Sequence, residues 1–226
     1  MSVLGNACLA MWWDMAPEMR VEFEHWHSHE HFPERLGIPG FLRATRWTSA
    51  SGGEGIFVMY ELTEHAVVSS PAYLASLNGP SPWSTRLMPH HRNMVRTQCH
   101  VLESRGTSVA RQALTVRLSP ASGQADALQA ALGERMAQWV GQPGLAGAHL
   151  LRHETPAIAQ TTEQKIRGGD QAADWVLVVC GYDAAALDAL AAAELSEAAL
   201  VKLGAEPGPV HGRFALSLSA TPADMR

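Results

Sequence analysis

The feature that most constrains the fold of this chain is an order of predicted elements that occurs twice. In the first half, strands are expected at 6–13, 41–47, 56–62 and 93–102, with helices at 17–31 and within 64–77. In the second half, strands are expected at 113–118, 144–152, 175–181 and 210–219, with helices at 125–139 and 183–203, the latter broken near Ser196. A β-α-β-β-α-β order is that of the ferredoxin-like unit, so the sequence predicts two such units in tandem. We expect the first unit to span 1–106 and the second 107–226.

Most of the predicted strands are apolar on both faces, as in NACLAMWW at 6–13, IFVMYEL at 56–62 and WVLVVCG at 175–181. A four-stranded sheet with helices on one face leaves its other face bare, so that second face must also be covered. The simplest cover is the sheet of the other half. The sequence therefore predicts an α+β fold in which two antiparallel sheets pack into one eight-stranded, pseudo-dimeric α/β barrel. A barrel of that size is just wide enough to hold a small ligand.

Charge and cysteine content exclude some classes of partner and of compartment. The net charge of −5 argues against nucleic acid or an anionic membrane as a partner. Three cysteines, Cys8, Cys99 and Cys180, lie in apolar strand-like runs, and an odd number excludes a fully paired set of intrachain disulfides. We therefore expect reduced, buried thiols in a cytoplasmic protein. The sequence contains neither a recognisable signal peptide nor a membrane helix.

The stretch 23–41, FEHWHSHEHFPERLGIPGF, concentrates four histidines, three carboxylates, a tryptophan and two prolines. It resembles the signature of the dimeric α/β-barrel superfamily and is most similar to its uncharacterised and ether-degradation (EthD-like) branches. The matching residues are Phe23, Trp26, Glu30, His31, Pro33, Glu34, Pro39, Gly40 and Phe41. The resemblance implies the barrel fold for the whole chain, as two fused units. It does not name a function, because the superfamily includes monooxygenases, isomerases, chlorite dismutases and proteins without known activity.

Within this stretch, His31 and Glu30 are the candidate catalytic residues. A histidine beside a carboxylate can be oriented and held near a neutral pKa for proton transfer. The structural alternative is that His31 bonds to backbone where the helix loosens before Pro33. On a helix, His27 and His31 share one face and His25 and His29 another. Such pairs can bind a divalent metal, but HSHEH lacks the zinc-protease spacing, so a solvated helix end is the simpler interpretation and we assign no metal ligands.

Candidate substrate-binding residues lie on two strands and on the first helix. Arg96, Gln98 and His100 alternate along 93–102 and share one face. Arg43 lies on the strand 41–47, and for it too the sequence leaves open whether its face lines the barrel. If these faces line the barrel, the side chains can orient a carboxylate, phenolate or carbonyl; if not, they are ordinary solvated positions. Trp26, in the signature, is a further candidate contact, although tryptophans are more often core residues.

A polar link at 157–174 separates two predicted strands. Links of that length in a compact domain are usually functional or disordered, so this one is either a cover for a barrel mouth, a partner contact or a mobile surface loop. The region 78–91 is predicted to be irregular. We find no phosphate-binding glycine loop and no nucleophile elbow.

Three functional hypotheses follow. The first is an enzyme that acts on a small hydrophobic or aromatic molecule in the barrel by proton transfer or cofactor-free oxygenation. The second is a non-catalytic ligand-binding or accessory protein with the same pocket. The third, the weakest, is a haem or metal protein that uses the histidines. No cofactor is predicted under the first two hypotheses, and both a monomer and a homodimer are compatible with the fused barrel.

Overall fold

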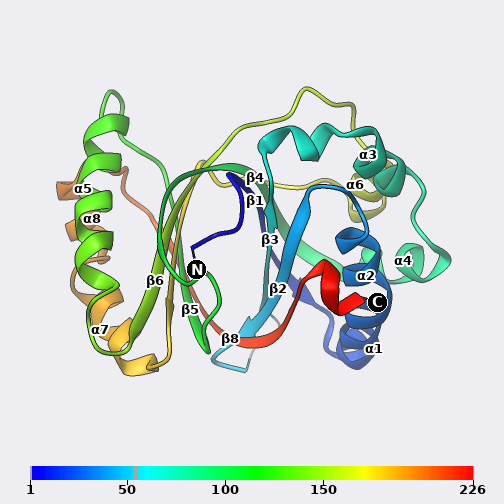
Figure 1. Cartoon of the computed structure of the whole chain (residues 1–226), viewed down its shortest axis with the longest axis horizontal. Helices are drawn as coiled ribbons and strands as arrows, with labels where there is room; N and C mark the ends of the chain where they lie inside the picture. Colours follow the sequence, from blue (N-terminus) through cyan, green and yellow to red (C-terminus); the bar gives the residue numbers. More distant parts are fainter. Residues whose placement is uncertain (1, 53–54, 226) are drawn as a thin grey trace.

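The structure is a computed structural model that describes residues 2–52 and 55–225. Eight antiparallel strands form a closed barrel in the order β1-β3-β2-β8-β5-β7-β6-β4 (Figure 1). The strands are β1 (Ala7–Met15), β2 (Phe41–Ser49), β3 (Gly55–Leu62), β4 (His91–Gly106), β5 (Gln112–Leu118), β6 (Leu145–His153), β7 (Trp175–Gly181) and β8 (Val210–Ala220). The predicted α+β barrel is thus confirmed.

The barrel is assembled from two half-sheets with equivalent strand order. Strands of the first half lie in the order β4-β1-β3-β2, and those of the second half in the order β8-β5-β7-β6. Two seams join them: β2 pairs with β8, where Ala44 lies opposite Ala220, and β4 pairs with β6, where Cys99 lies opposite His153. Each edge strand of one half therefore receives its missing hydrogen bonds from the other half, and the described barrel has no free sheet edge.

A helical layer covers each half-sheet on the outside of the barrel, as Figure 1 shows on its two sides. The second half carries α5 (Ala125–Trp139), α7 (Ala184–Ala192) and α8 (Glu197–Lys202). The first half carries η1 (Pro17–Met19), α1 (Arg20–Trp26), η2 (His27–His31), α2 (Phe32–Leu36), η3 (His65–Ser69), α3 (Pro71–Asn78), α4 (Pro82–Leu87) and η4 (Met88–His90), with η5 (Pro222–Met225) beside them. The link between β6 and β7, residues 154–174, contains α6 (Thr162–Arg167), which contacts η4 and α3 of the first half.

Side chains fill the middle of the barrel. Strand alternation turns Cys8, Ala10 and Trp12 of β1 inward, where they join an apolar cluster contributed by both halves. The rings of Trp12 and Trp47 each stack on Phe57 with centroids 5.0 Å away. This aromatic stack therefore occupies the part of the barrel interior where a ligand was expected.

The helix that begins at Pro17 was predicted to loosen before Pro33. It instead continues to Leu36. Its segment His27–His31 is π-helical, and the N–H of Phe32 donates to the carbonyl of His27, five residues earlier. In an α-helix the Pro33 ring would collide with the carbonyl four residues before it, and the wider π turn relieves that collision.

Two further segments test the predicted elements. The region 78–91 is not irregular but contains α4 and η4, because Ser81 caps α4 and Pro82 occupies its first turn. The predicted break near Ser196 is confirmed, since Ser196 is the N-cap of α8.

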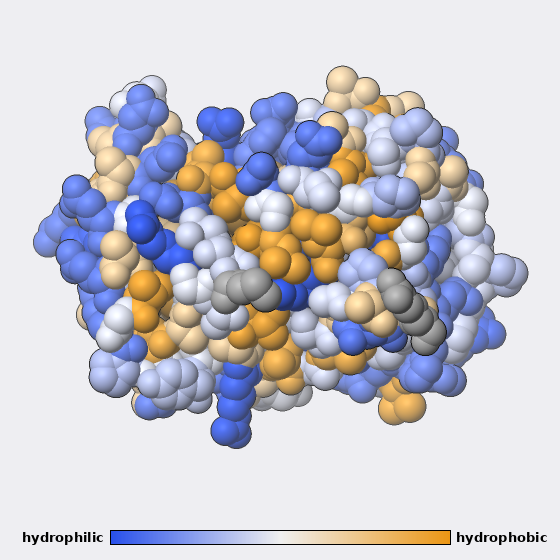
Figure 2. All heavy atoms as spheres, viewed as in Figure 1, coloured by the Kyte–Doolittle hydropathy of each residue, from blue (hydrophilic) through white to orange (hydrophobic). Residues whose placement is uncertain are grey.

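Among the described residues, no helix combines the length and the apolar character that crossing a membrane requires. In the same view as Figure 1, hydrophobic residues gather over the middle of the molecule, and hydrophilic residues surround them (Figure 2).

Candidate functional site

A cavity lies outside the barrel, between the first half-sheet and its helical layer. Its walls come from β1, β3 and β4, from the helical layer, and from α6 of the link. The enclosed space is about 40 Å³, and the lining residues are Met11, Trp13, Trp26, His27, His31, Arg35, Tyr60, Tyr73, Met88, His91, Met94, Arg96, Glu163 and Arg167. The corresponding region of the second half is packed with apolar side chains from α5, α7 and α8.

The floor of the cavity is the outer face of the first half-sheet. Met11 of β1 lies opposite Arg96 of β4, so both side chains leave the sheet on the side away from the barrel interior. Arg96 is 5% exposed, and its Nη2 donates to the hydroxyl of Tyr73 on α3 at 2.8 Å. Although burial alone lowers the pKa of Arg96, the hydrogen bond and charge interaction with Tyr73 raise it overall. A buried guanidinium therefore stays charged at the cavity wall.

The π-helical segment places two histidines on the opposite wall. His27 and His31 are buried, with ring centroids 5.4 Å apart, and His31 also lies 4.5 Å from the ring of Trp26. Burial holds the pKa of both imidazoles well below the usual range, and the positive charges of Arg46 for His27 and of Arg35 for His31 lower them further. Both rings are consequently neutral at pH 7, with one nitrogen able to accept a proton.

His91, at the start of β4, is a third neutral imidazole in the lining. Its Nδ1 lies 3.1 Å from the carbonyl of Met88, and its ring centroid lies 5.2 Å from that of Trp13. Burial, reinforced by the charge of Arg167, lowers the pKa of His91 to about 3. Because Met88 accepts a hydrogen bond from Nδ1–H, the Nε2 of His91 is the nitrogen left as an acceptor.

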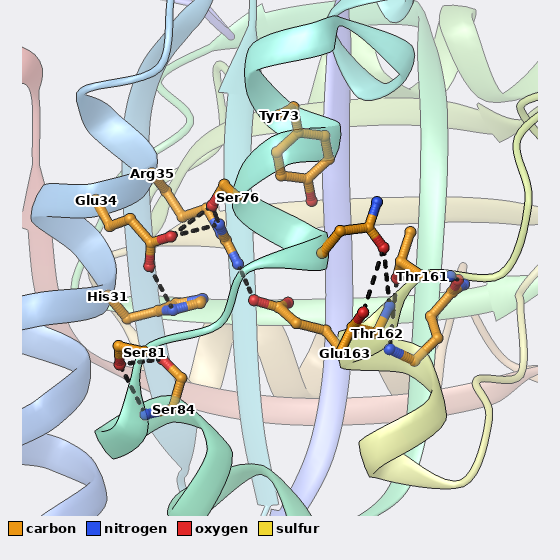
Figure 3. Close-up of polar contacts among 12 residues, drawn as sticks. His31, Glu34, Arg35, Tyr73, Ser76, Ser81, Ser84, Thr161, Thr162 and Glu163 are labelled. Carbon is orange, nitrogen blue, oxygen red and sulfur yellow. Dashed lines mark hydrogen bonds and ion pairs between the residues drawn. The ribbon is translucent and has the colours of Figure 1, made fainter.

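Helix α6 closes the cavity from the second half of the chain, as Figure 3 shows. Arg35 donates from Nη2 to Glu163 Oε1 at 2.5 Å, and both side chains are almost completely buried. Glu163 also lies 3.5 Å from Arg167, which forms a two-point ion pair with Asp170. Burial lowers the pKa of Arg35, but the carboxylate of Glu163 raises it above its ordinary value. This ion pair joins residues that lie 128 positions apart in the sequence.

Local capping fixes the position of α6. Thr161 and Gln164 form a capping box at its first turn, in which each side chain pairs with the other residue's backbone N–H. The N–H of Thr162 donates to the side-chain oxygen of Asn78 at the end of α3, at 3.1 Å. The helix is therefore fastened to the first half at its N-terminus and through Glu163.

The lining has a positive balance of charge. Three arginines and one glutamate contribute, namely Arg35, Arg96, Arg167 and Glu163, and the three histidines are neutral. The lining side chains alone sum to +2, but Asp170 pairs with Arg167 and Glu34 with Arg35 directly behind the lining. Among the described contacts, Arg96 bonds to the neutral hydroxyl of Tyr73, so its guanidinium is the positive charge that the lining offers to a ligand. A buried guanidinium in a low-dielectric cavity favours a ligand that is anionic or that becomes anionic on deprotonation.

Three buried polar atoms of lining residues have no hydrogen-bond partner among the described residues: Trp13 Nε1, His31 Nδ1 and Tyr60 Oη. The carboxylate nearest to His31 Nδ1 is that of Glu34, whose Oε2 is 3.8 Å away and beyond hydrogen-bond distance. Burial raises the pKa of Tyr60, so its hydroxyl stays protonated. Buried groups of this kind are uncommon, and three around one cavity indicate a place for water or for a polar ligand.

Of the residues predicted from sequence, the structure brings His31, Trp26 and Arg96 together at the cavity. Glu30 is not placed to orient His31, contrary to the expectation. Its carboxylate accepts hydrogen bonds from Trp26 Nε1 at 3.0 Å and from the hydroxyl of Ser81, which ties the first helix to α4. The neighbouring carboxylate that faces His31 is Glu34, four positions further along.

The other predicted residues lie elsewhere. Gln98 shares the face of Arg96 but lines a separate hollow of about 340 Å³ beneath the link. His100 follows on that face and lies at the β4·β6 seam, 3.2 Å from Glu154. Arg43 points into the barrel, where it donates to Ser108 at 2.9 Å and pairs with Glu61. These three residues do not converge with His31.

Sequence reasoning missed several lining residues. His27 was considered only as half of a possible metal-binding pair with His31, and Tyr60 lies inside an apolar strand. Glu163 and Arg167 are spaced four apart in the link, which is a helical ion-pair spacing. That spacing could have identified α6 as a helix, but nothing in it indicates that Arg35 is the partner.

Comparisons with known proteins give the fold alone. No protein-family model matches the chain, and no curated protein matches it. Among solved structures, an anthrone oxidase-like protein aligns over 100% of this chain and 98% of its own, with TM-score 0.69 and 11% identity.

Two proteins, each named "putative monooxygenase", also match. The one from Lactobacillus acidophilus NCFM has TM-score 0.61 and 8% identity, over 96% of this chain and 97% of its own. The one from Fusobacterium nucleatum has TM-score 0.63 and 8% identity, over 96% of this chain and 95% of its own. Together with the closed barrel, these similarities show a ferredoxin-like α/β-barrel fold.

Proposed function

We propose that this chain binds a small, largely apolar molecule with a weakly acidic group in the cavity of its first half and transforms it by proton transfer. The observation that carries the proposal is the set of three buried, unpartnered polar groups, Trp13 Nε1, His31 Nδ1 and Tyr60 Oη, around one cavity with a buried guanidinium. A ligand that accepts from the first and third and donates to His31 satisfies all three.

The enclosed space of about 40 Å³ holds a few water molecules. An aromatic ligand therefore enters by displacing α6, which is the part of the wall that belongs to the other half of the chain. The lining provides apolar contacts through Met11, Met88 and Met94, and methionine side chains adapt readily to the shape of a ligand. Opening and closing of α6 thus controls access to the site.

In the proposed reaction His31 is the base. Its neutral imidazole accepts the proton of the ligand's acidic C–H or O–H, and the buried guanidinium of Arg96 stabilises the anion that forms. If the anion is an electron-rich aromatic, it can pass electrons to O₂ in a cofactor-free oxygenation. The similarity to an anthrone oxidase-like protein and to proteins named as monooxygenases supports this second step.

Anthrone is the probe that tests the proposal. Deprotonation at its methylene carbon followed by reaction with O₂ yields anthraquinone and water. We expect anthrone to quench the fluorescence of Trp13 and Trp26 saturably, and O₂ uptake to accompany anthraquinone formation. His31→Ala should retain the quenching and lose the turnover, whereas His29→Ala, on the exposed face of the same segment, should retain both. Turnover that survives His31→Ala would refute the role of His31, and absence of saturable binding would refute the pocket for this ligand class.

A non-catalytic binding protein is the alternative function, and the small size of the closed cavity favours it. In that case anthrone or a related phenol quenches tryptophan fluorescence saturably, while neither the wild-type chain nor His31→Ala consumes O₂. The lining contains three histidines and singles out none of them as an axial ligand, so we do not propose a haem function.

We also propose that the chain is a tandem fusion of two ferredoxin-like units, 1–106 and 107–226, from the EthD-like branch, and that it acts in the cytoplasm. The equivalent strand order of the two half-sheets and the signature at 23–41 support the first part. The three buried cysteines, which form no disulfide, support the second.

A further inference from the structure

A second group of ligating side chains lies away from the cavity, at the seam between β4 and β6. His65 begins η3, His100 lies on β4, and Glu154 directly follows the end of β6. The Nε2 atom of His100 is 3.2 Å from Glu154 Oε2, and the Nε2 atom of His65 is 3.0 Å from the backbone carbonyl of Glu154. Within the described residues, this is the group of three whose ligand atoms all lie within 4.8 Å of one another.

We propose that His65, His100 and Glu154 bind one divalent transition-metal ion of the Zn²⁺ class. Two imidazole nitrogens and one carboxylate oxygen form a donor set that suits zinc, and three protein ligands leave a position open for water. The site is independent of the proposed function of the cavity, to which none of the three residues contributes.

The present contacts are ones that an ion can replace. The two imidazole rings are stacked, with centroids 4.3 Å apart and planes 14° apart, so their nitrogens lie side by side. An ion takes the place of the His100–Glu154 contact and of the His65 bond to the Glu154 carbonyl. The side chains of His100 and Glu154 are 36% and 58% exposed, which leaves them room to turn toward an ion and gives the ion a route from solvent.

Backbone pairing holds the three ligands at this place in the fold. The N–H of Glu154 donates to the carbonyl of Gln98 at 2.9 Å, which continues the β4·β6 register beyond β6. His65 and His100 belong to the first half, and Glu154 is the first residue of the link that carries α6. An ion bound here therefore fastens the root of the link to the first half of the chain.

The competing explanation for metal binding is the exposed pair His25 and His29 on the first helix, whose rings are 4.6 Å apart. Two histidines at i and i+4 bind divalent metals without a designed site. Variants of this pair therefore provide the matched control: they remove two histidines from the surface and leave the seam intact.

The test is Zn²⁺ binding by the full chain without an affinity tag, measured by calorimetry and by equilibrium dialysis with metal analysis. We expect one saturable site per chain. His100→Gln and Glu154→Gln should each weaken binding at least about tenfold, because loss of even an outer-shell partner of a metal commonly costs that much. His25→Gln/His29→Gln should bind as the wild type does.

Circular dichroism spectra of all variants establish that they are folded. Absence of a saturable site in the wild type overturns the proposal. So does unchanged Zn²⁺ affinity in a folded His100→Gln variant, or loss of the site in the His25→Gln/His29→Gln variant. A second readout is hydrogen exchange, which should slow at the root of the link when Zn²⁺ is added to the wild type and not when it is added to Glu154→Gln.

Discussion

At the scale of single residues, His31 combines burial, a neutral ring and an unpartnered nitrogen at the cavity. His31→Ala is expected to lower turnover of an anthrone-type substrate by about 10²–10⁴-fold, the usual contribution of a positioned base, with binding changed only a few-fold. The ratio of kcat/KM between wild type and variant measures the loss. A variant that loses binding and turnover together would assign His31 to ligand contact instead of proton transfer.

The pH dependence of that reaction follows from the same residue. Burial, and then the charge of Arg35, holds the pKa of His31 well below its ordinary value of about 6.5. The basic form therefore persists on acidification, so kcat/KM should stay constant from pH 8 to below pH 6.5 and decline only at more acidic pH. A pH-rate profile measures this, and an acid limb centred at or above pH 6.5 would contradict it.

Buried neutral histidines also make the fold sensitive to acid. The pKa of His91 is lowered to about 3, whereas in the unfolded chain it lies near 6.5, so the unfolded state binds more protons between these values. Its contribution is fully present above about pH 6.5 and declines by up to about 1.4 kcal/mol per pH unit as pH falls toward 3. Urea titrations at several pH values should show a shallower decline for His91→Asn than for wild type. Parallel curves would contradict this.

The sequence could identify site residues whose positions follow from local signals, but not those whose partners come from distant elements. The signature at 23–41 singled out His31 and Trp26, and alternation along 93–102 placed Arg96 on a polar face. Alternation alone left open whether that face lines the barrel or lies outside it. Glu30 and Arg43 failed because their partners, Ser81 and Glu61, come from other elements. Only tertiary pairing decides which of two neighbouring carboxylates, Glu30 or Glu34, faces a given histidine.

At the scale of elements, α6 is the part of the cavity wall that lies in the link from the second half, and the Arg35–Glu163 ion pair fastens it to the first half. Glu163→Ala removes the partner of Arg35 and leaves its guanidinium buried without a carboxylate at that position. Because an unpaired buried charge is costly, undocking of α6, which lets water reach Arg35, becomes more favourable. We expect faster hydrogen exchange across 160–170, faster tryptic cleavage at Lys165 and Arg167, and a faster ligand association rate. Exchange in the strands should change little, because their amides are held by pairing within the closed barrel.

The matched control is Glu194→Ala, which removes the half-buried ion pair with Arg135 in the second half. Solvent-accessible pairs contribute about 0–1 kcal/mol, so this variant should leave exchange in α6 unchanged. Equal exchange in Glu163→Ala and wild type would show that the Arg35–Glu163 pair does not hold α6 closed.

Element boundaries were predictable where one local rule decides them. Ser196 marks the start of α8 because its side chain caps the helix, and this was expected. Pro33 was expected to end a helix, but the π turn at His27–His31 absorbs it. Packing of Phe32 and Leu36 against the sheet offsets the local cost of that turn, and such a tertiary gain does not appear in local sequence patterns.

At the scale of the whole molecule, the barrel was predictable and its ligand site was not. Strands that are apolar on both faces require a second cover, and the repeated element order provides one. Whether the enclosed barrel holds a ligand or side chains depends on the volumes of inward residues, and Trp12, Trp47 and Phe57 fill it. The cavity instead lies in the layer where one half departs from the repeat through the histidine-rich stretch and receives α6 from the other half.

The proposed fusion of two units makes a prediction for the isolated first half, residues 1–106. Its sheet has β2 and β4 as free edges, and in the full chain these pair with β8 and β6, which occupy the equivalent positions of the second half. Two copies of the fragment can therefore pair β2 with β4 of the other copy twice and bury Trp12, Trp47 and Phe57 between them. Light scattering after gel filtration should give twice the fragment's mass.

When fragment 107–226 is added, a heterodimer should form in preference, since only it restores the contact of Phe57 with Phe214, 5.5 Å apart. A folded monomer, or fragments that never associate, would contradict the division at residue 106.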